Sequence, residues 1–145
     1  MQEEFSAELE LVNDYHFRIG FDDGGLPEVQ ADEPIPLGEG KYPNPVHYIS
    51  AAIGNCLCAS LVLCLRKVHS EPLSIKATVR TKLGRNEKGR LRITDMNVTI
   101  YPEVEDQAKL EKCISIFQDF CIVTAAVREG IDIGVSVEPK GSGIK

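Results

Sequence analysis

This sequence has fewer basic than acidic residues. The 145 residues include 16 lysines and arginines but 22 aspartates and glutamates, so the formal net charge is −6. Binding to nucleic-acid phosphates requires a basic surface, and we therefore expect no nucleic-acid partner. Residues 1–5 are acidic and lack the basic-then-apolar order of a signal peptide. This absence predicts a cytoplasmic protein.

The spacing of a metal site is also missing. Cys56 and Cys58 are separated by a single residue, unlike the cysteine pairs of zinc knuckles. The sequence has no second pair of closely spaced cysteines that could supply the other two ligands. The three histidines are scattered along the chain. We therefore expect neither a metal nor an organic cofactor. Five cysteines without a signal peptide do not indicate a disulfide framework either, which leaves small buried hydrophobes or redox-active and nucleophilic thiols.

Uncharged stretches long enough to cross a membrane are nearly absent. The one candidate, residues 49–65, reaches the lower length limit of a transmembrane helix. Two serines, a glycine and an asparagine make it more polar than a membrane span, and the rest of the chain has the composition of a soluble protein. We predict no membrane partner. Residues 47–68 instead form a helix that is apolar nearly all round and lies in the protein core.

Repeats and linkers are absent, so we expect a single domain, residues 1–145. Strand-like alternation, turn residues and helical periodicity predict the elements. In chain order they are an antiparallel meander over 6–31, a loop rich in proline and glycine over 32–45, the core helix 47–68, a hairpin with strands 73–82 and 91–101, a helix starting at 102–106, a helical piece over 121–128 and a last strand over 131–138. The first of the later helices should bury Leu110, Cys113, Ile114 and Phe117. This order predicts an α+β fold.

The cysteines divide into two groups. Cys58, Cys64 and Cys113 lie in apolar segments, and we interpret them as small hydrophobes. Cys58 is about 200° around the helix from Cys56, so these two thiols face apart. Cys56 and Cys121 also lie in apolar helical stretches, and their residues alone are compatible with a structural or a chemical role. We favour the chemical interpretation, a thiol–disulfide redox site.

Two motifs carry a resemblance to a known family. The first consists of Asp32-Glu33-Pro34, Leu37-Gly38-Glu39-Gly40, Pro43-Asn44-Pro45 and Ser50-Ala51-Ala52-Ile53-Gly54-Asn55-Cys56. The second is Cys121-Ile122-Val123-Thr124-Ala125-Ala126-Val127. Together with the predicted hairpin and helix between them, they resemble the OsmC/Ohr family of thiol peroxidases. The similarity extends from the first strands to Val137.

The resemblance implies an OsmC-like fold with antiparallel sheets around a long buried central helix. It also implies an intertwined homodimer whose active sites lie at the subunit interface, and a role in the oxidative stress response. Cys56 would attack an organic hydroperoxide and become a sulfenic acid. Cys121 would then form a Cys56–Cys121 disulfide, which an external dithiol reduces. Because the thiolate is the attacking species, Cys56 would need a cation or hydrogen-bond donor that lowers its pKa.

The sequence departs from the family at the residues that would activate Cys56. Val46 stands where peroxidatic members have a glutamate that holds an arginine against the thiol. The candidate activating residues are therefore Arg18, Lys41 and His47. An alternative function is that of a non-peroxidatic member that binds a small apolar or thiol ligand in the pocket at the dimer interface. A third possibility is a structural or regulatory dimer with inert thiols.

Overall fold

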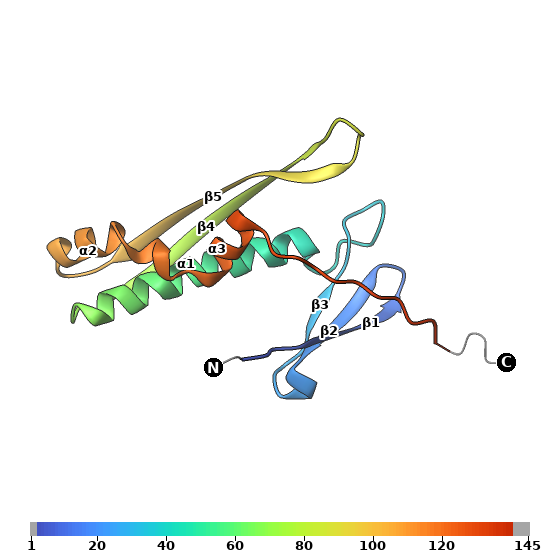
Figure 1. Ribbon diagram of the computed structural model, residues 1–145, viewed down its shortest axis with the longest axis horizontal. Coiled ribbons are helices and arrows are strands. Elements are labelled where there is room, and N and C mark those ends of the chain that lie inside the picture. Colours follow the sequence, from blue (N-terminus) through green and yellow to red (C-terminus); the bar gives the residue numbers. More distant parts are fainter. Residues whose placement is uncertain (1–2, 141–145) are drawn as a thin grey trace.

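The computed structural model describes residues 3–140 and shows an α+β arrangement with two antiparallel sheets (Figure 1). The first sheet contains β1 (Ala7–Asn13), β2 (His16–Phe21) and β3 (Val29–Ala31), and the second contains β4 (Ser74–Arg85) and β5 (Leu91–Glu103). The helices are α1 (Pro45–Lys67), α2 (Gln107–Ile114) and α3 (Ile122–Glu129), with short 3₁₀ turns η1 (Asp22–Gly24) and η2 (Phe117–Phe120).

The predicted meander is confirmed. β2 lies between β1 and β3, and Leu9 pairs with Ile19 in the antiparallel register. Asp14 turns the chain between β1 and β2 with a positive φ of 46°, a conformation that aspartate tolerates better than most residues. This sheet lies beyond the N-terminal end of α1 (Figure 1). The Tyr48 hydroxyl of α1 donates to the backbone carbonyl of Gln30 and ties the sheet to the helix.

The loop over residues 32–44 is organised around one buried carboxylate. Asp32 is only 4% exposed and accepts hydrogen bonds from the backbone N–H groups of Glu33 (2.7 Å), Glu39 (3.3 Å) and Lys41 (3.3 Å). A Cβ at Gly38 would lie 2.3 Å from the Asp32 carboxylate, so the loop closes only around a residue without a side chain. The predicted irregular segment is therefore an ordered loop, held by these hydrogen bonds, that leads into α1.

Helix α1 begins with a capping box. The Asn44 side chain accepts from the His47 N–H at 2.9 Å, and the Asn44 N–H donates to His47 Nδ1 at 3.0 Å. Pro45 occupies the first turn, where its missing N–H leaves no hydrogen bond unmade. Arg66 and Lys67 occupy the last turn, where positive charge is favourable. These local signals explain why the apolar run folds as one long helix.

One face of α1 forms the core, while another face stays open. Ile53, Leu57, Leu61, Cys64 and Leu65 are buried with residues of α2, η2 and α3. Exposed residues on the helix include Ala52, Asn55, Ala59 and Leu63. The prediction of a helix buried nearly all round is therefore not met within the single chain. By length and composition α1 could also span a membrane, but its packing against the hairpin and α3 accounts for the same apolar composition.

The hairpin packs along α1 and extends further than predicted. A Cβ at Gly54 would lie 2.7 Å from Val79 Cγ2, so α1 approaches β4 directly at this glycine. β5 continues to Glu103, which pairs with Ser74. Pro102 was predicted in the first turn of the next helix but lies in β5, because the ladder with β4 reaches past it. α2 instead starts after Asp106, whose side chain accepts from the Lys109 N–H at 3.1 Å.

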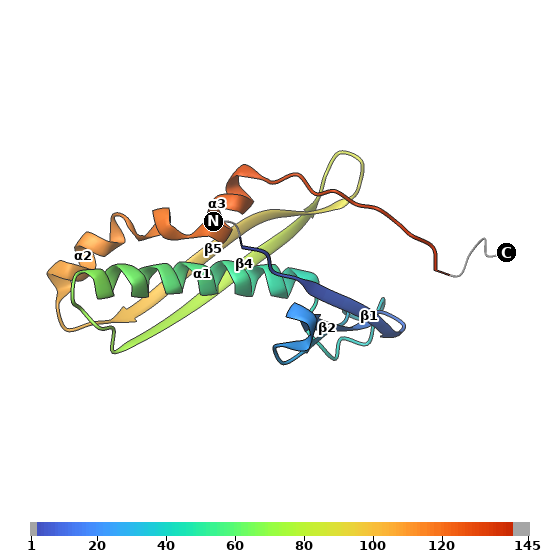
Figure 2. The ribbon, with the colours of Figure 1, turned by 60° about the horizontal axis from the view of Figure 1, so that its bottom comes forward.

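The chain returns along α1 through α2, η2 and α3 (Figures 1 and 2). Leu110, Cys113 and Phe117 are buried as predicted, but Ile114 ends α2 and is 48% exposed. The predicted last strand, 131–138, is also absent as a strand. These residues leave α3 as an unpaired segment, because no strand within residues 3–140 lies alongside to form a ladder with them. Ile131, Ile133, Val135 and Val137 are consequently exposed.

Candidate functional site

Cys56 and Cys121 meet where α1 passes the N-terminal end of α3. Cys56 lies in the middle of α1, and Cys121 is the N-cap residue of α3. The two thiols lie close enough for each to affect the pKa of the other. They are therefore arranged as a pair that could exchange a proton or form a disulfide. Both are free thiols in this structure.

Of the two thiols, Cys121 is the one with hydrogen bonds to Thr124. It is 1% exposed, its Sγ lies 2.9 Å from Thr124 Oγ1, and the Thr124 N–H donates to it at 3.3 Å. Burial opposes ionisation of Cys121. The hydrogen bonds of Cys121 with the Thr124 side chain, the Cys56 thiol and the amides of Thr124 and Val123 outweigh burial, so the pKa of Cys121 lies below the ordinary cysteine value.

Cys56 lies in a less favourable environment for a negative charge. Burial is the largest cause that raises the pKa of Cys56, and the interaction with Cys121 raises it further. The backbone N–H groups of Val123 and Ile122, at the start of α3, point toward its sulfur and lower the pKa without reversing the shift. In the isolated chain Cys56 is therefore the thiol of the pair that keeps its proton longer.

The three candidate activating residues lie elsewhere in this chain. Arg18 on β2 forms an ion pair with Glu10 on β1, and Lys41 forms one with Glu39 at 2.9 Å. His47 is occupied by the capping box of α1. Within residues 3–140, no hydrogen bond joins a lysine, arginine or histidine to either sulfur. The two thiols interact with each other, with Thr124 and with the amides of α3.

The sequence alone did not single out Thr124. It is the third residue of α3, and its backbone N–H bonds to the N-cap side chain as the His47 N–H does at the start of α1. A cysteine followed three residues later by threonine at a helix start was the available signal. It is a weak one, because cysteine is not among the preferred N-cap residues.

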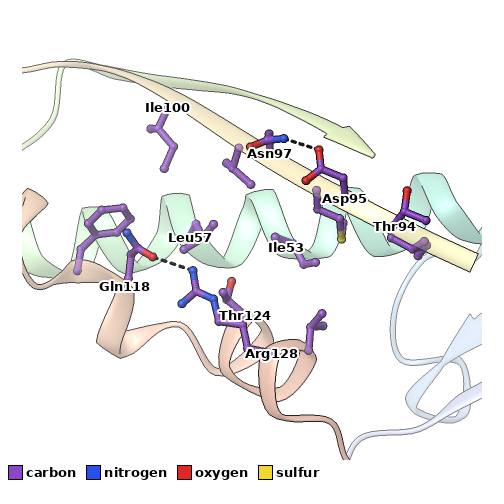
Figure 3. A pocket seen from close by; sticks show the side chains of 14 residues that line it. Ile53, Leu57, Thr94, Asp95, Asn97, Ile100, Gln118, Thr124 and Arg128 are labelled. Atoms are coloured by element: carbon purple, nitrogen blue, oxygen red, sulfur yellow. Dashed lines mark hydrogen bonds between the residues drawn. The ribbon is translucent and has the colours of Figure 1, made fainter. Parts of the chain in front are cut away.

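A cavity of about 430 Å³ lies between α1, β5, η2 and α3 (Figure 3), and neither Cys56 nor Cys121 is among its lining residues. Its walls include Ile53 and Leu57 of α1, Ile100 of β5 and Phe117 of η2, and Thr124 also lines it. At its α3 side, Arg128 donates to Gln118 Oε1 at 3.0 Å. Eight of its fourteen lining residues are apolar and six are polar or charged, including Asp95 and Asn97 of β5. The cavity reaches Thr124, the residue that contacts Cys121.

A second apolar cavity, of about 350 Å³, lies between the N-terminal sheet and the start of α1. The side chains around it include Leu9, Phe17, Ile19, Tyr48 and Pro45. Like the first cavity it is lined by neither cysteine of the pair, and unlike the first it is lined by no residue of α3. A ligand in this cavity would therefore be bound away from the thiols of the same chain.

The remaining cysteines have the environment predicted for small hydrophobes. Cys64 and Cys113 are buried in the core, where they contact each other across α1 and α2. Burial, with a further contribution from Cys64, raises the pKa of Cys113 to about 11. Burial also raises the pKa of Cys58. Such thiols stay protonated at neutral pH and are poor nucleophiles.

Comparisons with known proteins agree on one family. The family described as OsmC-like protein matches residues 38–136, whereas no curated protein matches. A solved OsmC-like protein of unknown function from Vibrio cholerae is 18% identical, with a TM-score of 0.74, over 86% of this chain and 94% of that one. A hypothetical protein from Aquifex aeolicus is 25% identical, with a TM-score of 0.68, over 88% and 89%. The organic hydroperoxide resistance protein OhrB of Bacillus subtilis is 18% identical, with a TM-score of 0.65, over 90% and 94%.

Proposed function

The chain belongs to the family of OsmC-like proteins, and from this premise we propose that it reduces organic hydroperoxides with Cys56 and Cys121. The observation that carries the proposal is that these two thiols affect each other at the start of α3, where Thr124 contacts Cys121 and also lines a cavity. The similarity in fold to OhrB, named as an organic hydroperoxide resistance protein, points in the same direction. A role in the oxidative stress response would follow.

The reaction would use each thiol once. The Cys56 sulfur attacks one peroxide oxygen, the O–O bond breaks, and the alkoxide leaves and takes up a proton to give the alcohol. Cys56 is then a sulfenic acid. Cys121 attacks its sulfur and expels hydroxide, which becomes water, and the Cys56–Cys121 disulfide forms. An external dithiol returns both residues to thiols by exchange.

The environment of the pair favours an organic substrate over hydrogen peroxide. Eight of the fourteen residues that line the cavity beside Thr124 have apolar side chains. Such a surface gains free energy by covering the alkyl part of a hydroperoxide, whereas hydrogen peroxide offers no apolar surface. No metal or organic cofactor is required for this thiol chemistry.

We also propose that the working unit is a homodimer. Exposed small and apolar residues on α1 and the unpaired apolar segment 131–138 offer surfaces that a second copy would cover. The partner subunit would then cover the exposed face of α1, and the helix would lie in the centre of the dimer. Arg18, Lys41 and His47 of the second copy are the candidates for a cation beside Cys56. A cytoplasmic location would keep both thiols reduced between turnovers.

The first experiment mixes fully reduced protein with cumene hydroperoxide in a stopped-flow instrument and identifies the cysteine peptides by mass spectrometry. We expect stoichiometric peroxide consumption and a Cys56–Cys121 disulfide. Cys56→Ser should abolish consumption, and Cys121→Ser should leave a trapped Cys56 sulfenic acid. Cys58→Ser, on the same helix but facing away from the pair, is the matched control and should react as the unaltered protein does.

The second candidate is a non-peroxidatic protein that binds a small apolar or thiol ligand. The raised pKa of Cys56 and the lack of a cation at either sulfur within residues 3–140 favour it. Unchanged peroxide and free thiols after prolonged mixing would overturn the reductase. A rise in melting temperature with short-chain alcohols or thiols would then support the binding function. No rise, together with thiols that resist alkylation in the native protein, would indicate a structural dimer.

A further inference from the structure

The second cavity, between the N-terminal sheet and the start of α1, combines two kinds of side chain that the proposed thiol chemistry does not use. Three of its nine lining residues are aromatic, namely Tyr15, Phe17 and Tyr48. Two others, Asp32 and Glu33, are acidic, and none of the nine is a lysine, arginine or histidine. Its volume of about 350 Å³ is within the range of sites that bind small organic molecules.

The apolar wall of the cavity is one face of the N-terminal sheet. Leu9 of β1 pairs with Ile19 of β2, and Phe17 is two residues from Ile19 on the same strand. Because side chains alternate along a strand, these three residues share one face of the sheet. Tyr48 adds a ring from α1, and its hydroxyl donates to the backbone carbonyl of Gln30. Since the hydroxyl is occupied, the ring is the part of Tyr48 that a ligand can contact.

The two carboxylates at the cavity differ in their partners. Asp32 is 4% exposed, and its oxygens accept hydrogen bonds from three backbone N–H groups. These donors stabilise the ionised form, but they are dipoles and leave its net charge in place. Glu33 is partly buried, and no lysine, arginine or histidine within residues 3–140 forms an ion pair with it. The cavity therefore carries negative charge that its own lining does not balance.

The surroundings of the cavity have the same sign of charge. Residues 3–44 contain eleven aspartates and glutamates but only two lysines or arginines, Arg18 and Lys41. Each of these two is already paired with a carboxylate, Arg18 with Glu10 and Lys41 with Glu39. A cavity in a region dominated by one sign of charge attracts ligands of the opposite sign.

We propose that this cavity binds an organic cation with an alkylated ammonium head. Such a head spreads its charge over methyl groups, so it can contact aromatic rings and carboxylates together. A divalent metal ion would need several free oxygen ligands, whereas the Asp32 oxygens already accept three N–H groups. A neutral apolar ligand would fit the rings but would gain nothing from the carboxylates. The site is separate from the thiols and does not depend on the reductase function.

Isothermal titration calorimetry of the full-length protein with choline tests the proposal. The neutral counterpart is 3,3-dimethyl-1-butanol, which has carbon in place of the ammonium nitrogen and nearly the same shape. We expect choline to bind with a dissociation constant roughly tenfold lower than that of the alcohol. Equal affinities would overturn the proposal. So would a failure of choline to bind, which is the result expected if a second copy of the chain fills the cavity.

Substitutions locate the binding site. Glu33→Gln removes the carboxylate that has no ion pair and should weaken choline binding roughly tenfold, with little effect on the alcohol. Phe17→Leu keeps an apolar side chain but removes a ring, and it should weaken choline binding several-fold. Glu8→Gln is the control, because Glu8 is exposed on β1 next to Leu9 and lies on the opposite face of the sheet. It should change the dissociation constant by less than about twofold.

The control also separates the cavity from the general field of the acidic sheet. If Glu8→Gln weakens choline binding as much as Glu33→Gln does, the cation is attracted by the whole sheet, and the assignment of the cavity is wrong. If Phe17→Leu does not fold, the comparison of Glu33→Gln with Glu8→Gln decides the question. Cys56→Ser should bind choline as the unaltered protein does, so the outcome is independent of whether the protein reduces hydroperoxides.

Discussion

At the scale of single residues, the pKa of a side chain in this protein depends on which backbone and side-chain groups donate hydrogen bonds to it. Cys56 and Cys121 are chemically identical, yet the pKa of Cys56 is raised by burial and by its partner. The pKa of Cys121 is lowered because hydrogen bonds outweigh burial. Asp32 is a third case. Burial alone would raise its pKa, but the N–H groups of Glu33, Lys41 and Glu39 and the nearby His16 lower it.

The lowered pKa of Asp32 predicts a loss of stability in acid. A carboxyl group whose pKa is lower in the folded state stabilises the fold fully above its unfolded pKa, which is about 4. That contribution is lost as the pH falls through the folded pKa. We therefore expect Asp32→Asn to unfold at a lower urea concentration than the unaltered protein at neutral pH. The difference should shrink as the pH falls below the unfolded pKa and through the lower, folded one.

Urea unfolding at neutral and at acidic pH measures this difference directly. Glu111→Gln is the matched control, because Glu111 is exposed on α2 and its change removes the same charge outside the loop. It should leave the unfolding midpoint nearly unchanged. A gap between Asp32→Asn and the unaltered protein that stays constant with pH would show that the carboxylate charge does not stabilise this loop.

At the scale of elements, α1 organises the molecule. It is capped by Asn44, approaches β4 at Gly54, and contributes half of the buried apolar cluster. It also carries Cys56 past the start of α3. Any change that loosens the packing of α1 should therefore affect both the free energy of unfolding and the geometry of the thiol pair.

Leu61→Ala tests this role of α1. Leu61 is 2% exposed in the centre of the buried cluster, so truncation leaves a cavity. We expect it to lower the free energy of unfolding by about 2–5 kcal/mol. Leu73→Ala, at a position 60% exposed between α1 and β4, should change it by less than about 1 kcal/mol. Equal effects of the two changes in chemical unfolding would argue against α1 as the centre of the core.

At the scale of the whole molecule, the open surfaces of one chain predict assembly. The exposed residues of α1 include Ala52, Ala59 and Leu63, and four apolar side chains of 131–138 alternate along an unpaired segment. We expect Ala59→Arg to shift the protein from dimer to monomer in sedimentation-velocity measurements, because a buried arginine at this interface would be unpaired. Ala108→Arg, an exposed alanine on α2, should leave the dimer intact. A monomeric unaltered protein would contradict the homodimer.

The sequence by itself determined most of the local structure and the family. Alternation predicted the meander and the hairpin, the uncharged apolar run predicted α1, and two cysteine motifs indicated the OsmC-like family. These features are local, since periodicity and turn chemistry act over a few residues. The misplaced start of α2 and the strand expected at 131–138 were wrong because a strand exists only where a neighbour forms the ladder. β4 provides that neighbour for Pro102, and residues 131–138 have none among the described strands.

The tertiary structure alone decided the chemistry of the site. Cys56 and Cys121 are far apart in the chain, and only the packing of α3 against α1 brings them together. Their order of acidity and the part played by Thr124 depend on hydrogen bonds a few ångströms long, made at one end of α3. A sequence pattern states which side chains are present. It cannot state which donors face a sulfur, and the protonation of a buried thiol depends on those donors.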